Sequence, residues 1–153
     1  MATTFTQPVS SQTTLTVTGF STLANGTYVA SNDIDLTTLN SVNGPLDLQI
    51  LVEATPGSVS GNKQVVVFAQ ASKDGSTYTT GPTSGTTTTD EPVLHYVGAL
   101  PLPTNSTLQR RWFSLAATFP TLPPHCRLIF KNDSGAALTT AVVTIATVTA
   151  SGA

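Results

Sequence analysis

Apolar residues recur at every second position in several short stretches of this chain, and this pattern limits its fold more than any other feature. Between Leu46 and Ala54 every second residue is apolar, while Asp47, Gln49 and Glu53 are polar. Successive side chains of a β-strand point to opposite faces of a sheet, so this stretch predicts a half-buried strand. No stretch shows the 3.6-residue repeat of an amphipathic helix, and the sequence therefore predicts an all-β protein.

Turn residues divide the chain into about eight or nine antiparallel strands. Asn25-Gly26 and Asp74-Gly75 are the strongest turn signals, because these pairs favour the left-handed backbone of tight hairpins. Gln64–Ser72 begins apolar on both faces, which predicts a central strand. The candidate stretches from which these eight or nine strands are drawn are Thr13–Phe20, Thr27–Ala30, Ile34–Leu36, Leu46–Ala54, Gln64–Ser72, Ser76–Thr80, Val93–Ala99, Arg111–Phe119, Cys126–Lys131 and Leu138–Thr149.

A chain of 153 residues is long enough for one domain with its own hydrophobic core. The natural packings of this many strands are a two-sheet sandwich or a barrel. Long proline-rich crossings, such as Leu100–Gln109, favour a jelly-roll-like β-sandwich over a simple meander. We expect residues 13–153 to form this single sandwich domain.

The first twelve residues differ from the rest of the chain. They are polar and uncharged, and they show neither alternation nor a core-sized apolar cluster. Residues 1–12 are therefore predicted to be an extended N-terminal arm that becomes ordered on contact with a partner, because ordering costs about 1–2 kcal/mol per residue. Phe5 and Pro8 are the only anchors that the arm offers.

Composition excludes several classes of function. The chain has 6 Lys and Arg residues and a net charge of −2, whereas nucleic-acid binding needs clustered basic residues. One Cys and two His cannot supply a cysteine or histidine metal cluster. No apolar run approaches membrane-spanning length, and the N-terminus lacks the features of a secretory signal. We expect no catalytic activity, no cofactor and no metal ion.

Two small groups of residues have possible chemistry. Asp33 and Asp35 could offer oxygen ligands to calcium, but Asp35 lies beside Ile34 in what reads as a short strand. Cys126 follows His125, yet alternation places Cys126 on an inward face, where a free cysteine is usually a small buried residue. The structural interpretation is the stronger one in both cases.

The sequence Arg110-Arg111-Trp112 is the one basic and aromatic patch. Alternation assigns the core face of this strand to Phe113, Leu115, Ala117 and Phe119, so Trp112 starts on the opposite face. Arginine and tryptophan are favoured anchors of protein interfaces. We therefore expect Arg110, Arg111 and Trp112 to contact a neighbouring subunit, either another copy or a different protein; the alternative is a surface arginine pair beside a core tryptophan.

Three stretches together carry a resemblance to a known family. They are VVVFAQASKDGSTYTT (residues 65–80), LHYVGALPLPTNSTLQRRWFSLAATFP (residues 94–120) and CRLIFKNDSGAAL (residues 126–138). This order of hairpin, variable loop and proline-rich crossing resembles the jelly-roll cement, or decoration, proteins of tailed bacteriophages. The resemblance covers most of the chain between Leu46 and Leu138.

The resemblance implies a structural virion protein without enzymatic activity. Such a protein binds the outer surface of an icosahedral phage head and stabilises contacts between major capsid proteins. Its partners would be the major capsid protein and other copies of itself, as a dimer or trimer, with no direct contact to nucleic acid or membrane. It would be made in the host bacterial cytoplasm and reside on the outer capsid surface of the virion.

A different function stays open on the same residues. A carbohydrate- or receptor-binding β-sandwich module of a phage tail would need exposed aromatic rings beside polar side chains. The chain offers only Trp112, Tyr28, Tyr78 and Tyr96 for this purpose. A jelly-roll enzyme of the cupin type is disfavoured, because its metal site needs several histidines and a glutamate.

Overall fold

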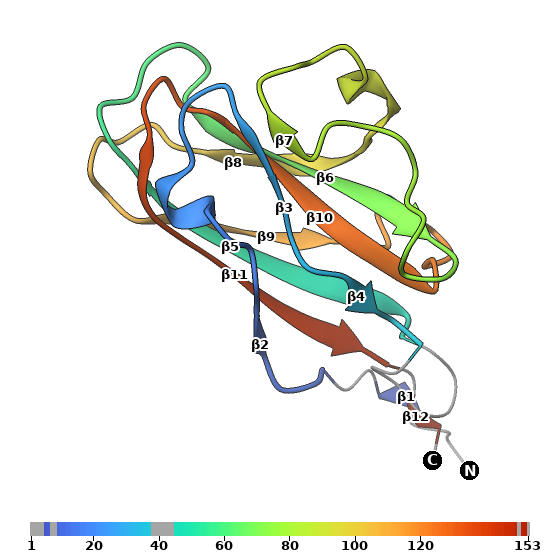
Figure 1. The fold of residues 1–153 in the computed structure, drawn as a ribbon. Coiled ribbons are helices and arrows are strands. Elements are labelled where there is room, and N and C mark those ends of the chain that lie inside the picture. Colours follow the sequence, from blue (N-terminus) through green and yellow to red (C-terminus); the bar gives the residue numbers. More distant parts are fainter. Residues whose placement is uncertain (1–4, 7–8, 38–44, 150, 153) are drawn as a thin grey trace.

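Strands make up most of the regular structure in the computed structural model, which describes residues 5–6, 9–37, 45–149 and 151–152 (Figure 1). The all-β prediction is confirmed. The strands are β1 (Phe5–Thr6), β2 (Thr13–Leu15), β3 (Tyr28–Ala30), β4 (Ile34–Asp35), β5 (Asp47–Pro56), β6 (Gln64–Ser72), β7 (Ser84–Gly85), β8 (His95–Pro101), β9 (Gln109–Ser114), β10 (His125–Asp133), β11 (Leu138–Val148) and β12 (Ser151–Gly152). Two short 3-10 helices are η1 (Phe20–Thr22) and η2 (Glu91–Val93).

The strands form two antiparallel sheets that pack as a sandwich. One sheet has the order β2-β11-β5-β9, and the other has the order β7-β3-β10-β6-β8, with β4 also paired to β10. Four strand pairs are nested in the sequence, from the innermost to the outermost: β6–β8, β5–β9, β3–β10 and β2–β11. Successive pairs belong alternately to the six-stranded and the four-stranded sheet. This is the jelly-roll-like sandwich that the sequence predicts.

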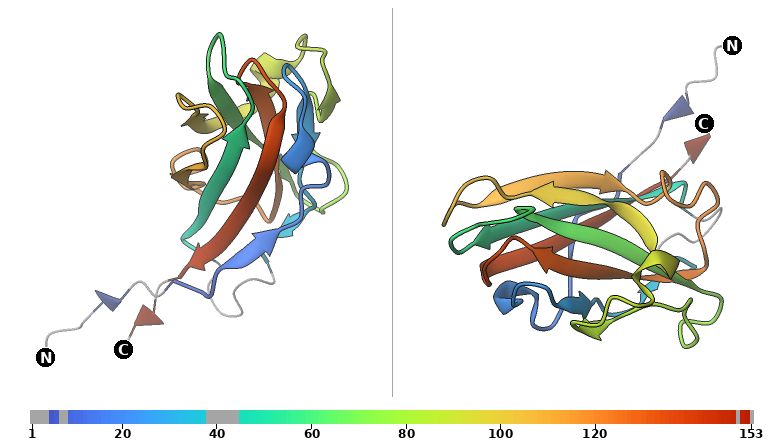
Figure 2. Two further views of the ribbon diagram at one scale, coloured as in Figure 1. Left: turned by 90° about the vertical axis from the view of Figure 1, so that its left-hand side faces the viewer. Right: turned by 90° about the horizontal axis from the view of Figure 1, so that it is seen from above.

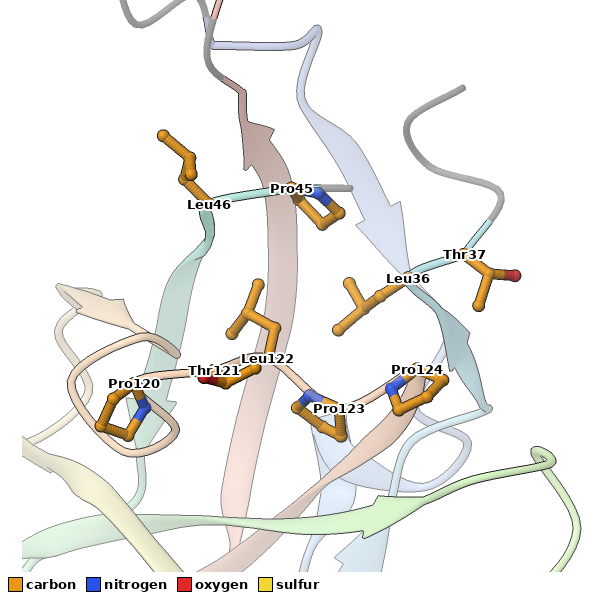
Figure 3. A pocket seen from close by; sticks show the side chains of 9 residues that line it. All are labelled: Leu36, Thr37, Pro45, Leu46, Pro120, Thr121, Leu122, Pro123 and Pro124. Carbon is orange, nitrogen blue, oxygen red and sulfur yellow. The ribbon is translucent and has the colours of Figure 1, made fainter. Parts of the chain in front are cut away.

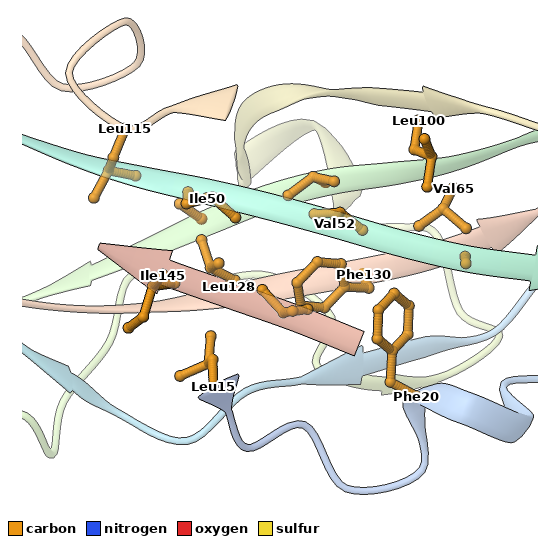
Figure 4. Close-up of a cluster of buried hydrophobic side chains, with 14 of the residues drawn as sticks. Leu15, Phe20, Ile50, Val52, Val65, Leu100, Leu115, Leu128, Phe130 and Ile145 are labelled. Atoms are coloured by element: carbon orange, nitrogen blue, oxygen red, sulfur yellow. The ribbon is translucent and has the colours of Figure 1, made fainter. Parts of the chain in front are cut away.

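The core lies between the two sheets and follows the predicted alternation. Leu48, Ile50, Val52 and Ala54 of β5 are fully buried, with the polar residues between them on the other face. Side chains from both sheets interdigitate in this layer (Figure 4). Burial of each large aliphatic side chain contributes about 1.5–3 kcal/mol to folding, so this layer holds the two sheets together.

The outer face of the six-stranded sheet is covered by the chain itself. Val66 and Phe68 of β6 point to this face and pack with Tyr28, Leu94 and Ile129. The covering segment is residues 73–94, which we call the cap loop; it contains β7 and η2. A second small core under the cap loop explains why β6 is apolar on both faces.

Two predicted strands are shorter in the structure because turns interrupt them. The stretch Thr13–Phe20 was expected to be one strand, but β2 ends at Leu15. Gly19 adopts a φ of 87°, which favours glycine, and Phe20 then turns into the core with 1% exposure. The expected strand Arg111–Phe119 ends at Ser114, and the backbone amide of Phe119 donates to the carbonyl of Leu115.

Other expectations were wrong at individual positions. Ala117 is exposed in the turn after β9 instead of facing the core. Leu46 is 45% exposed because it precedes β5 at the end of the sandwich, outside the alternating layer.

Ser76–Thr80 is not a strand, since the carboxylate of Asp74 accepts hydrogen bonds from the backbone amides of Ser76 and Thr77 and closes a compact turn. The predicted strand Val93–Ala99 starts only at His95, after η2.

The two ends of the chain meet outside the sandwich. Phe5 and Thr6 of β1 pair with Gly152 and Ser151 of β12, and Figure 2 shows this terminal ribbon projecting from one end of the molecule. Closer to the sandwich, the backbone amide of Ser10 donates to the carbonyl of Thr147. The described part of the predicted arm is thus extended and lies along the chain's own C-terminal end; Pro8 lies outside the described residues.

Candidate functional site

Neighbouring residues of β9 point to opposite sides of the four-stranded sheet. Arg110, Trp112 and Ser114 pair with Glu53, Leu51 and Gln49 of β5, whereas Arg111 and Phe113 pair with the buried Val52 and Ile50. Arg110 and Trp112 therefore lie on the outer face, and Arg111 lies on the inner side. The expected patch of three residues is divided between two places.

Arg111 bridges the two sheets at the side of the sandwich where β8 and β9 are the edge strands. Its Nη1 donates a 3.0 Å hydrogen bond to the carbonyl of Ala99 in β8, and its guanidinium lies 5.7 Å from the centre of the Phe113 ring. The hydroxyl of Thr118 donates to the carbonyl of Tyr96 on the same edge. These side chains occupy carbonyls that an added strand would use, so they protect the edge from pairing with another chain.

Trp112 is 49% exposed and lies outside the core, as alternation predicts. On the same face, the Nε of Arg110 forms an ion pair with Oε1 of Glu53 at 3.1 Å, and the Arg110 side chain is 62% exposed. Trp112 pairs across the strands with Leu51, which pairs in turn with Thr144. Glu53 pairs in the same way with the exposed Val142. We call this outer surface of the four-stranded sheet the open face.

A shallow hollow of about 410 Å³ lies beside Trp112 on the open face, lined also by Asp47, Gln49, Phe113 and Ser114. The carboxylate of Asp47 has a structural role, because it accepts hydrogen bonds from the Ser114 hydroxyl and from the Ala116 backbone amide. The side-chain amide of Gln49 makes no hydrogen bond to any described residue. Gln49 therefore has unused donors and acceptors beside an exposed indole.

A second polar cluster surrounds His125, which lies at the start of β10. Its Nδ1 is 2.9 Å from Oδ2 of Asp33, and its Nε2 is 3.9 Å from Oδ1 of Asp35. The Tyr78 hydroxyl donates to the other oxygen of Asp33. The hydrogen bond with Asp33 raises the pKa of His125 above its usual value. This cluster ties the first turn of the cap loop, at Gly75 and Tyr78, to the segment around β4.

The same contacts bear on calcium binding. Asp33 already faces His125 and Tyr78, and Asp35 accepts from the amide and the hydroxyl of Thr37. Within the described ranges, no group of three or more His, Cys, Asp and Glu side chains is arranged to hold a metal ion. The two aspartates are engaged in interactions that tie neighbouring segments together.

Cys126 is completely buried, as predicted, and shares the inward face with Leu128 and Phe130. Burial raises the pKa of its thiol to about 12, so the reactive thiolate form is disfavoured.

A third polar cluster fastens the far end of the cap loop to the sheet. The Nζ of Lys131 in β10 is 2.6 Å from Oε2 of Glu91 in η2, and the hydroxyl of Tyr28 donates to the same oxygen. Sequence reasoning missed both this cluster and the one at His125. Their members lie far apart in the chain, so no local spacing signals them.

The end of the sandwich that carries the terminal ribbon also carries apolar surface. Val9 is 50% exposed and Leu46 is 45% exposed there. A hollow of about 420 Å³ lies at the same end (Figure 3). Its lining residues are Leu36, Thr37, Pro45, Leu46, Pro120, Thr121, Leu122, Pro123 and Pro124.

Comparison with known proteins gives no family: no protein-family model matches this chain, and no curated protein matches its sequence. Among the described residues, no helix is long and apolar enough to cross a bilayer.

Proposed function

We propose that this chain is a structural virion protein, a decoration protein that binds the outer surface of an icosahedral phage head. In this role it stabilises contacts between major capsid proteins and needs no catalytic group. The sequence resemblance to jelly-roll cement proteins and the nested two-sheet topology both support the proposal. Jelly rolls of this kind occur in viral capsid proteins as well as in lectins.

The observation that carries the proposal is the terminal ribbon. β1 and β12 pair with each other beyond the sandwich, so both chain ends leave the domain together at one end. A two-stranded ribbon by itself is marginal in water, since isolated hairpins need further burial for stability. A partner surface would supply that burial.

The surface around the base of the ribbon is suited to the same contact. Val9 and Leu46 expose aliphatic side chains there, and the proline-lined hollow lies next to Leu46. Rigid proline rings lose little side-chain entropy on binding, which favours a contact surface that does not rearrange. We therefore assign the ribbon end to the capsid contact, and Phe5 and Pro8 stay the anchors that the sequence predicts for this contact.

Electron cryomicroscopy of the particle with which the chain copurifies tests this proposal. We expect density for the sandwich outside the shell at two-fold or three-fold axes, with the ribbon end toward the capsid. Density confined to the tail would instead support a receptor- or carbohydrate-binding tail module. A particle without the sandwich at either place would contradict both functions.

A further inference from the structure

The open face differs from the rest of the surface, because it presents one aromatic ring between two groups of hydrogen-bonding side chains. We propose that the open face is a binding site for a neutral saccharide, with Trp112 as the stacking platform. This function goes beyond decoration of a capsid and does not depend on it.

The platform lies on β9, the edge strand of the four-stranded sheet, next to β5. Trp112 is cross-strand neighbour to Leu51, which is in turn paired with Thr144, so the indole has an apolar and β-branched neighbourhood. About half of the Trp112 side chain is open to solvent, and its Nε1 makes no hydrogen bond to a described residue. A sugar ring that stacks on the indole would bury its C–H face and keep its hydroxyl groups at the rim.

Hydrogen-bonding groups flank the platform on both sides along the strands. On one side are Gln49 and Ser114, and on the other are Glu53 and Arg110. Residues two apart in a strand are about 7 Å apart, so the flanking groups span about 14 Å in total. A disaccharide laid across the indole could reach both groups.

The flanking groups have capacity left for a ligand. No described residue makes a hydrogen bond with the side-chain amide of Gln49. The Arg110–Glu53 ion pair is formed through Nε, so the terminal nitrogens of Arg110 have no partner among the described residues. Arg110 and Glu53 balance each other on one side of the platform, while the Asp47 carboxylate lines the hollow on the other side. The site therefore favours an uncharged sugar over an acidic one.

A protein partner fits this face less well. Carboxylates are depleted at the buried centre of a protein interface, whereas Glu53 lies directly beside the platform in its pair with Arg110. The half-buried Leu51 adds little exposed apolar area around Trp112. A polar ligand with one apolar face matches this pattern better than an apolar protein surface does.

The three tyrosines are poorer platforms. Tyr28 is buried under the cap loop, and the Tyr78 ring is covered by the Arg127 guanidinium at 4.0 Å. Tyr96 is 60% exposed, but it lies on the opposite sheet, in edge contact with Phe68. Tyr96 therefore serves as the matched control for an exposed aromatic side chain.

The single tryptophan of the chain makes the test direct, because its fluorescence reports from the site itself. The purified full-length protein is first applied to an array of neutral and sialylated glycans. The glycan that binds best is then titrated at micromolar to millimolar concentration while the indole emission is recorded. We expect a saturable change in emission with a neutral glycan.

Variants locate the site and separate the outcomes. Trp112→Ala and Gln49→Ala should each weaken binding to the array about tenfold or more, while Tyr96→Ala should bind as the unmodified protein does. Circular dichroism confirms that each variant is folded. Absence of array binding, or binding that survives Trp112→Ala, would overturn the proposal.

A third result would assign the open face to a subunit contact. In that case no glycan binds, and Trp112→Ala weakens association with another copy or with the particle. This outcome would also overturn the saccharide site while leaving the proposed capsid function intact.

Discussion

Trp112 and Phe113 are adjacent in the sequence but lie in different environments. The indole lies on the open face, whereas the Phe113 ring packs against the main core and under the Arg111 guanidinium. The close approach of Phe113 to β8 requires a glycine at position 98, because a Cβ there would lie 2.5 Å from the ring. Side-chain direction in β9 thus decides which residue stabilises the fold and which is free to bind.

Substitution of these two neighbours should therefore have unequal effects. Trp112→Ala should change the free energy of unfolding by less than about 1 kcal/mol, as at other surface positions. Phe113→Ala should cost about 2 kcal/mol or more, since it leaves a cavity between the sheets. Urea denaturation of both variants measures this difference, and a cost of about 3 kcal/mol or more for Trp112→Ala would place the indole in the core.

His125 makes stability depend on pH in a defined direction. The hydrogen bond with Asp33 raises its pKa in the folded protein above the unfolded value of about 6.5. Its contribution to stability is therefore fully present below pH about 6.5 and is lost as the pH rises through the folded pKa. The carboxylates of Asp35 and Asp74 also act on the imidazole, and the Tyr78 hydroxyl donates to the same Asp33.

Denaturation midpoints between pH about 5.5 and about 8.5 check this dependence. We expect the midpoint to fall with rising pH in the unmodified protein and to vary less in His125→Gln. His95→Gln is the control, because His95 packs against Phe119 and has no carboxylate partner among the described residues. If stability varies with pH in His125→Gln as it does in the unmodified protein, His125 is not the group responsible for the pH dependence.

At the scale of elements, the sequence predicted what is determined locally. Alternation located β5 and β10, because burial on one face of a sheet follows every second residue, and an apolar run on both faces located β6. It failed at Thr16–Phe20 and Leu115–Phe119, where the residues have strand-like composition but the chain turns to bury Phe20 or Leu115. The contacts of Arg111 and His125 depend on strands far apart in sequence, and no local pattern encodes that register.

Glu91 holds the far end of the cap loop to the sheet. Its carboxylate forms an ion pair with Lys131 and accepts a hydrogen bond from the Tyr28 hydroxyl. Glu91→Ala removes the shared acceptor, so it should cost about 1 kcal/mol and increase local opening of residues 73–94. Hydrogen exchange of the loop amides measures the opening. Asp90→Ala is the control, and equal exchange in the two variants would show that Glu91 does not hold the loop.

On the scale of the whole molecule, the two outer faces and the two ends of the sandwich are unlike. The cap loop covers one sheet, the other sheet keeps its open face, and the ribbon leaves from one end. The proposed capsid contact lies at the ribbon end and the proposed saccharide site lies on the open face. The two sites adjoin where Leu46 is followed by Asp47.

Deletion of residues 1–8 tests the role of the ribbon. It removes β1 but keeps Val9 and Ser10, which contact β11. The melting temperature should stay nearly unchanged because the sandwich core is intact, while binding to the capsid should be lost. Calorimetry and a particle-binding assay measure the two quantities, and normal binding by the deletion variant would contradict the capsid contact assigned to this end.

The nested strand pairs also determine when the fold can be completed during synthesis. The innermost pair, β6 with β8, closes the shortest loop and can form while the chain is still growing. The outermost pair within the sandwich, β2 with β11, joins segments from near the two ends of the sequence. β11 lies between β2 and β5, so a central strand of the four-stranded sheet is synthesised after the other three. Until then the edge of β5 is unpaired, so a nascent chain that stalls before β11 is the form most prone to aggregate.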